Sequence, residues 1–108
     1  LGALLDPRLG RALEALHGDV SHAWTVSEFA RVAGMSRAAF SAEFAKSMGH
    51  PPMTYLRKWR LALAQTALRR GDKSVGEVAR MVGYTSPSAF SQAFRHAFGR
   101  SPKTGSPS

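Results

Sequence analysis

The chain repeats itself: residues 28–52 match residues 77–102, with one residue inserted near Thr85 in the second copy. Acidic, basic, aromatic, glycine and proline residues all recur in register. The matched pairs are Glu28 with Glu77, Ala30 with Ala79, Arg31 with Arg80, Gly34 with Gly83, Phe40 with Phe90, Ser41 with Ser91, Phe44 with Phe94, Gly49 with Gly99, and Pro52 with Pro102. Internal duplication explains this match, so the chain is expected to build one small unit twice.

Each copy begins with the signature of a helix start. Thr25 stands three residues before Glu28, and Ser74 stands three residues before Glu77. This is the spacing of a capping box, in which two side chains satisfy backbone amides that have no partner inside the helix. The sequence therefore predicts a helix start at the same place in both copies.

Each of these helices runs about nine residues to a glycine, Gly34 or Gly83, which can take the left-handed conformation that ends a helix. A second helix follows at once. Ser36 is its predicted N-cap in the first copy, and Ser86 with Pro87 at the first helical position starts it in the second. Helix, short turn and helix are thus predicted twice.

Two further helices complete the pattern. Asp6 and Pro7 are typical of a helix start, and the helix that follows is expected to end near Gly18. A longer helical pattern runs from Pro52 to Arg70 and carries apolar residues on one side and basic residues on the other. At 1.5 Å per residue this connecting helix is roughly 28 Å long, close to the roughly 34 Å turn of DNA.

The predicted fold class is all-α, because no segment shows the alternation of a half-buried strand. We expect two helix-turn-helix subdomains joined by a long central helix, with about six or seven helices in all. The predicted boundaries are 1–50 for the first helix-turn-helix subdomain, 51–71 for the connecting helix, 72–104 for the second subdomain and 105–108 for a disordered tail.

Composition and charge narrow the function. A chain of 108 residues with 44% hydrophobic residues is expected to fold, and its formal net charge of +8 attracts polyanions. No apolar run reaches the roughly 20 residues of a membrane span, so no membrane partner is expected. The lack of cysteine fits a reducing, cytoplasmic location. The first residue is Leu1 and not Met, which suggests that a partner domain precedes this chain.

An enzyme is not expected. The four histidines, at 17, 22, 50 and 96, form no metal-ligand pair at helical spacing, and no nucleophile-elbow or phosphate-loop pattern appears. The sequence therefore predicts no catalytic residue, no metal and no cofactor.

Two stretches, GMSRAAFSAEFAKSMGHPP (34–52) and VARMVGYTSPSAFSQAFRHAFGRSPK (78–103), resemble the DNA-binding domain of the AraC-type transcription regulators of bacteria. The resemblance covers about residues 6–104. The phrase PPMTYLRKWRLALAQ (51–65) is similar to the connecting helix of members that carry a cupin-like N-terminal sensor domain. The resemblance implies sequence-specific binding of double-stranded DNA in the major groove, regulation of transcription, and a sensor domain absent from this chain.

The second helix of each unit would be the recognition helix by this resemblance, over residues 37–48 and 87–98. Aromatic side chains at three-to-four-residue spacing, Phe40 and Phe44 in the first and Phe90, Phe94 and Phe98 in the second, are expected to point inward. The family's base-reading positions then fall on Ala38, Ser41 and Ala42 in the first unit and on Pro87, Ser88, Ser91 and Gln92 in the second.

Basic residues near these helices are expected to bind phosphate, together with the backbone amides of the helix starts. The predicted phosphate contacts are Arg37, Lys46, Arg95 and Arg100. On the connecting helix, Arg57, Lys58, Arg60, Arg69 and Arg70 either contact DNA or form an ordinary solvated face. Arg31 and Arg80 are expected to pair with Glu28 and Glu77. Glu43 departs from the basic residue common there in the family.

A different class of function stays open. One helix-turn-helix unit of such a pair could mainly dock RNA polymerase, which we expect as a partner, or a second protomer. The chain would then be a protein-interaction module whose DNA binding is weak, salt-labile and without preferred sequence. Sequence preference would distinguish the two functions.

Overall fold

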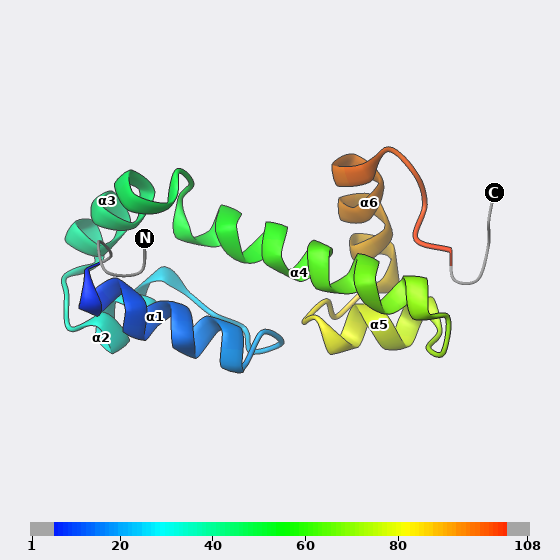
Figure 1. Cartoon of the computed structure of the whole chain (residues 1–108), viewed down its shortest axis with the longest axis horizontal. Helices are drawn as coiled ribbons and strands as arrows, with labels where there is room; N and C mark the ends of the chain where they lie inside the picture. The colour runs from blue at the N-terminus through cyan, green and yellow to red at the C-terminus, as the bar shows by residue number, and fades with distance from the viewer. Residues whose placement is uncertain (1–5, 104–108) are drawn as a thin grey trace. The chain divides into compact units, whose positions relative to one another are not determined.

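The computed structural model describes residues 6–103, and helices are the only regular secondary structure in that range. In chain order they are α1 (Pro7–Gly18), α2 (Val26–Ala33), α3 (Arg37–Met48), α4 (Pro52–Arg70), α5 (Val75–Met81) and α6 (Pro87–Phe98), coloured from blue to red in Figure 1. The predicted all-α class is confirmed. The predicted tail, 105–108, lies outside the described residues. Across 6–103, no helix is both long and apolar enough to cross a membrane.

The chain divides into two compact units between Arg57 and Lys58, which lies within α4. The first unit contains α1, α2 and α3, and the second contains α5 and α6. The predicted connecting helix is present as α4, from Pro52 to Arg70, but its residues are shared between the two units.

The first unit closes around apolar residues from each of its helices. Its aromatic rings form a continuous series in which neighbouring centroids are 4.7 to 6.2 Å apart, from Trp24 through Phe29, Phe40 and Phe44 to Tyr55. The buried hydrophobic residues up to the unit boundary are Leu9, Ala12, Leu16, Phe29, Ala30, Ala33, Phe40, Phe44 and Leu56, and Pro52 is buried as well.

The second unit takes its first helix from α4. Leu61, Ala64 and Leu68 of α4 are buried in one cluster with residues of α5 and α6. Their spacing of three and then four residues equals that of Leu9, Ala12 and Leu16 in α1. The repeat therefore comprises three helices and not two. The sequence predicts α4 only as a connector, whereas its second half has the core role that α1 has in the first unit.

The predicted caps are confirmed. Capping boxes join Thr25 to Glu28 and Ser74 to Glu77. Gly34 and Gly83 both take positive φ, at +72° and +102°. Local chemistry thus sets the helix boundaries at both helix-turn-helix turns.

Further details concern the two capping glutamates, Phe98 and Pro102. The Nε2 of His22 lies 3.0 Å from the Oε2 of Glu28, and Glu77 accepts a hydrogen bond from the Ser74 amide. The charges of Arg31 and Arg80 also help to lower the pKa of Glu28 and of Glu77, respectively. Phe98 is only half-buried because it ends α6. Pro102 is buried, so packing continues past the last helix.

Candidate nucleic-acid interface

Helix α3 separates an aromatic face from a small, polar one. Phe40 and Phe44 are 0% and 1% exposed. Arg37, Ala38 and Ala42 are exposed, and Ser41 is half-buried. The structure thus places the predicted base-reading positions of the first unit opposite its core, with the predicted phosphate contact Lys46 exposed near the end of the helix.

Helix α6 has the same arrangement with more polar chemistry. Phe90 and Phe94 are buried, whereas Pro87, Ser88 and Gln92 are exposed and Ser91 is half-buried. Gln92 can both donate and accept hydrogen bonds, and no side chain on the exposed face of α3 offers a comparable amide. The two candidate reading faces therefore differ in chemistry although their backbones repeat.

The two helix starts also differ. In α3 the Ser36 hydroxyl accepts from the Ala39 amide at 3.1 Å, which leaves the amides of Arg37 and Ala38 outside the helical bonding pattern. In α6 the Ser86 hydroxyl accepts from the Ala89 amide at 3.2 Å. Pro87 has no N–H, so α6 presents one fewer amide at its start than α3.

Arg100 is held beside α6 by an aromatic ring. Its Cζ lies 5.8 Å from the centroid of Phe94, within range of a cation–π interaction. Because Phe94 belongs to α6, this contact places the guanidinium beside that helix. Arg95, also predicted to bind phosphate, is exposed on the last turns of the same helix.

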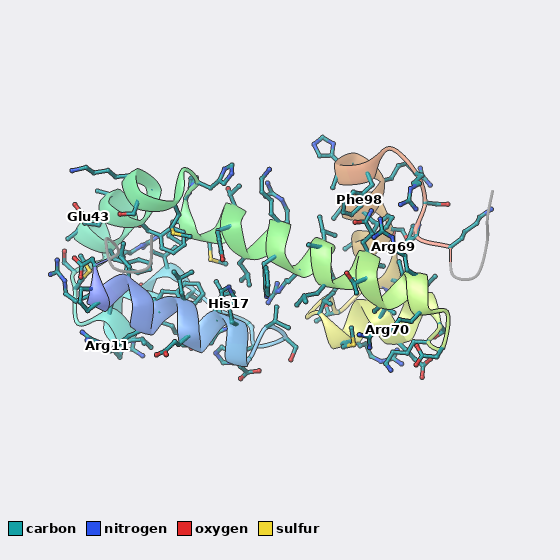
Figure 2. The ribbon with its side chains drawn as sticks, in the orientation of Figure 1. Arg11, His17, Glu43, Arg69, Arg70 and Phe98 are labelled. Carbon is teal, nitrogen blue, oxygen red and sulfur yellow. The ribbon has the colours of Figure 1, made fainter. Side chains whose placement is uncertain are left out.

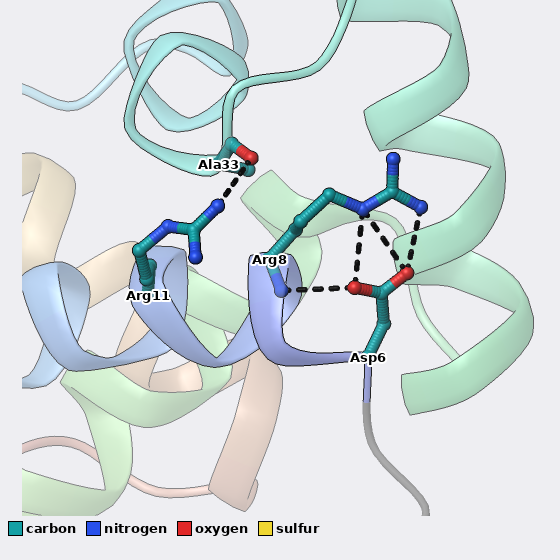
Figure 3. A network of polar contacts seen from close by, with 4 residues as sticks. All are labelled: Asp6, Arg8, Arg11 and Ala33. Carbon is teal, nitrogen blue, oxygen red and sulfur yellow. Dashed lines mark hydrogen bonds and ion pairs between the residues drawn. The ribbon is translucent and has the colours of Figure 1, made fainter.

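An acidic group modifies the charge around α3. Asp6 caps α1, accepting from the Arg8 amide at 2.9 Å and forming an ion pair with the Arg8 guanidinium at 2.7 Å (Figure 3). These hydrogen bonds lower the pKa of Asp6 to about 2. Glu43 of α3, labelled in Figure 2, adds to the effect of Asp6 in raising the pKa of Arg8. The unexpected carboxylate on α3 therefore has a cation of its own unit nearby.

Two arginines, one in each unit, contact the helix-turn-helix turns. Arg11 of α1 donates from Nη2 to the Ala33 carbonyl at 3.1 Å (Figure 3). Its Nε donates to the Val32 carbonyl at 3.4 Å. These carbonyls end α2 and have no helical partner. Their contact with Arg11 depends on tertiary packing, and no motif in the sequence signals it.

Arg60 of α4 takes a different position at the second turn. A Cβ built on Gly83 would lie 2.9 Å from its Cζ. Burial lowers the pKa of Arg60, and the neighbouring Tyr84 opposes this effect. Arg60 is half-buried against its own unit, so it is not part of an ordinary solvated face.

Comparison with known proteins decides the family. A family model described as a helix-turn-helix domain matches residues 29–105. A putative AraC-like transcription regulator of Streptomyces antibioticus is 41% identical over 102 residues, which are 94% of this chain and 34% of that protein. The chain belongs to the AraC-type helix-turn-helix family. It spans about a third of the length of such relatives.

Other relatives of this AraC-type chain are named as transcription regulators and not as enzymes. The regulator AlkR of Acinetobacter baylyi is 40% identical over 103 residues, which are 95% of this chain and 34% of that protein. The activator RclR of Escherichia coli is 40% identical over 102 residues, 94% of this chain and 36% of that protein.

Solved structures share the AraC-type fold found here. The DNA-binding domain of the global transcriptional factor AdpA, solved in complex with a target DNA, has a TM-score of 0.83 and 33% identity, covering 88% of this chain and 86% of that one. The C-terminal domain of the response regulator AraT from Geobacillus stearothermophilus has a TM-score of 0.86 and 28% identity, covering 92% and 83%.

Proposed function

We propose that this chain binds double-stranded DNA sequence-specifically, placing α3 and α6 in the major groove, and so regulates transcription. The observation that carries the proposal is the repeated helix-turn-helix, whose second helix buries its phenylalanines and exposes its opposite face. The net charge of +8 favours a polyanion. The similarity to the AdpA domain, solved with its target DNA, supports the same function.

The second unit is proposed to read more of the sequence by hydrogen bonds. Gln92 can bond an adenine in bidentate fashion, and Ser88 and Ser91 can bond either edge of a base pair. In the first unit Ala38 and Ala42 can contact a thymine methyl group, and Ser41 supplies the only hydroxyl among the three predicted readers there. We therefore infer that α6 contributes the larger share of base discrimination.

Phosphate binding is proposed for Arg37, Lys46, Arg95 and Arg100. These residues would set the position of each recognition helix on DNA and the salt dependence of binding. The amides at the start of α3 add donors for the same purpose. RNA polymerase as a partner and an N-terminal sensor domain stay predictions of the family resemblance.

Selection of duplex DNA from a random library by the 108-residue chain, at physiological salt, tests the proposal. Two enriched blocks about one helical turn apart are expected if both units read DNA. A single block that Gln92→Ala abolishes would assign reading to the second unit alone. Retention without sequence enrichment would refute sequence-specific binding and favour the protein-interaction module.

Two substitutions on α6 separate base reading from phosphate binding. Gln92→Ala should relax preference at one base step by about 1–3 kcal/mol and leave the other steps unchanged. Arg95→Ala should weaken binding nearly equally on all sequences and reduce the slope of log affinity against log salt by about 1. Affinities measured for single-base variants of the selected site check both; an unaltered base preference in Gln92→Ala would contradict the role of that residue.

A further inference from the structure

Gly83 is the most tightly packed glycine of the two helix-turn-helix turns. A Cβ built on it would lie 2.9 Å from Cζ, 2.9 Å from Nη2 and 3.0 Å from Nε of Arg60. Real Cβ atoms do not approach other heavy atoms so closely. The absent side chain of Gly83 therefore leaves the space that the Arg60 guanidinium occupies.

The three distances also show which side of the guanidinium faces the turn. A point in the plane of the group, approaching the edge between Nε and Nη2, would be clearly farther from Cζ than from the two nitrogens. Here the three distances are nearly equal, which requires a point above the plane. Arg60 therefore lays the face of its guanidinium on Gly83, and its N–H edges point elsewhere.

From this contact a short path leads to the recognition helix. Tyr84 follows Gly83, and its amide donates to the Ala79 carbonyl at 2.9 Å, closing the end of α5. The ring of Tyr84 lies 5.4 Å from that of Phe90, edge to face. Phe90 is fully buried and belongs to α6, so the turn that Arg60 covers is joined to α6 by aromatic packing.

The first unit lacks this arrangement. A Cβ on Gly34 would meet only Nη2 of Arg11, at an ordinary 3.9 Å, and Arg11 uses its N–H groups on the carbonyls that end α2. Face packing of an arginine on the turn is thus specific to the second unit among the two described turns. That unit also carries Gln92.

We propose that Arg60 is the positioning residue of the second recognition helix, fixing α6 on α5 by packing its guanidinium face on Gly83. Arg60 acts on base reading through Tyr84 and Phe90 and does not itself bind DNA. This inference rests on the proposed function, in which α6 reads bases.

The test compares Arg60→Lys with Lys58→Ala in the 108-residue chain, on the site selected by the wild type. Lysine keeps the charge of Arg60 but has no planar face. Arg60→Lys is expected to lower discrimination about tenfold in the block that Gln92→Ala affects, with no change in the other block or in the salt slope. Lys58→Ala, which removes an exposed charge from the same helix, should leave discrimination unchanged in both blocks.

Three outcomes would overturn the proposal. Arg60→Lys with wild-type discrimination would show that the planar face is not needed. An equal loss in both blocks would show general destabilisation in place of positioning. A salt slope reduced by about 1 in Arg60→Ala but not in Arg60→Lys would identify Arg60 as a phosphate contact.

A measurement without DNA keeps the two proposals separate. In amide spectra of the free chain, Arg60→Lys should shift resonances of Gly83, Tyr84 and α6 while those of α1–α3 stay in place. If the wild type selects no sequence, the proposed function fails and these spectra alone decide whether Arg60 positions α6. If α6 does not shift, the positioning role fails even where sequence selection succeeds.

Discussion

Gly34 and Gly83 occupy the same position in the two repeats, and both take positive φ, but only Gly83 is covered by an arginine face. The end of the helix at each of these glycines could be predicted, because a glycine after a capped helix is a local signal. The contact with Arg60 was not predictable, since Arg60 is 23 positions earlier in a helix whose basic residues all looked alike. Local sequence spacing does not predict a residue's role when that role depends on a contact that only the fold creates.

This difference predicts unequal costs for the same substitution. Gly34→Ala should cost about 1–2 kcal/mol, the penalty of the left-handed conformation for an L-residue. Gly83→Ala should cost more, because its φ of +102° lies farther from the left-handed region than the +72° of Gly34, and because its Cβ also displaces the half-buried Arg60. Unfolding in urea measures both. In an Arg60→Ala background the cost of Gly83→Ala should fall toward that of Gly34→Ala; the same cost in both backgrounds would contradict the steric account.

Asp6 gives a pH-dependent contribution to stability. Its folded pKa of about 2 lies below its ordinary 3.8, so its charged form is favoured by folding. The stabilisation is therefore fully present above about pH 4 and is lost as pH falls toward 2. Asp6→Asn, which keeps an N-cap acceptor but not the charge, should flatten that part of the melting temperature profile. A profile identical to that of the wild type would contradict the ion pair with Arg8.

At the scale of helices, the boundaries could be predicted well and their packing only in part. Thr25, Ser74 and the glycines cap helix ends through contacts with residues only a few positions away, so sequence spacing predicts these caps. The second role of α4 was missed because Leu61, Ala64 and Leu68 continue the apolar pattern of the whole helix. The spacing of apolar residues along a helix stays the same where the helix passes from one core to another, so the sequence pattern does not show the change.

The inward face of each recognition helix can be tested by truncating its central aromatic residue. Phe44→Ala and Phe94→Ala should each destabilise the chain by about 3–5 kcal/mol, because each opens a cavity in a closed core. Met81→Ala is a suitable control, since Met81 is 41% exposed. Thermal unfolding followed by circular dichroism measures whether both phenylalanine variants melt at a lower temperature than the Met81→Ala control. Melting unchanged by either phenylalanine substitution would refute the core assignment.

For the whole molecule, the fold class and family could be predicted because duplication, caps and motif stretches agree. The base-reading and phosphate-binding residues stay predictions, because exposure on α3 and α6 is necessary for DNA contact but does not demonstrate it. The chemistry of these faces, amide-bearing in α6 and small in α3, was already visible in the sequence. The structure adds which arginines make contacts within their own unit, such as Arg11 and Arg60.

The shared α4 predicts how the chain can be divided. A fragment of residues 58–108 should unfold cooperatively, because it contains every residue of the buried cluster of the second unit. A fragment of residues 72–108 should not, because it lacks Leu61, Ala64 and Leu68. Helical circular dichroism with thermal melting distinguishes them. Equal cooperativity in both fragments would show that α4 is only a connector.

The division inside α4 also determines where a chimera of two such proteins should be spliced. A chimera spliced at Gly71, where the sequence suggests a border, would join α5 and α6 of one protein to a core helix chosen for another. A splice between Arg57 and Lys58 transfers the core helix, Arg60 and Gly83 together. Under the proposed function, the segment that must be transferred intact therefore includes the second part of α4 as well as the helix-turn-helix.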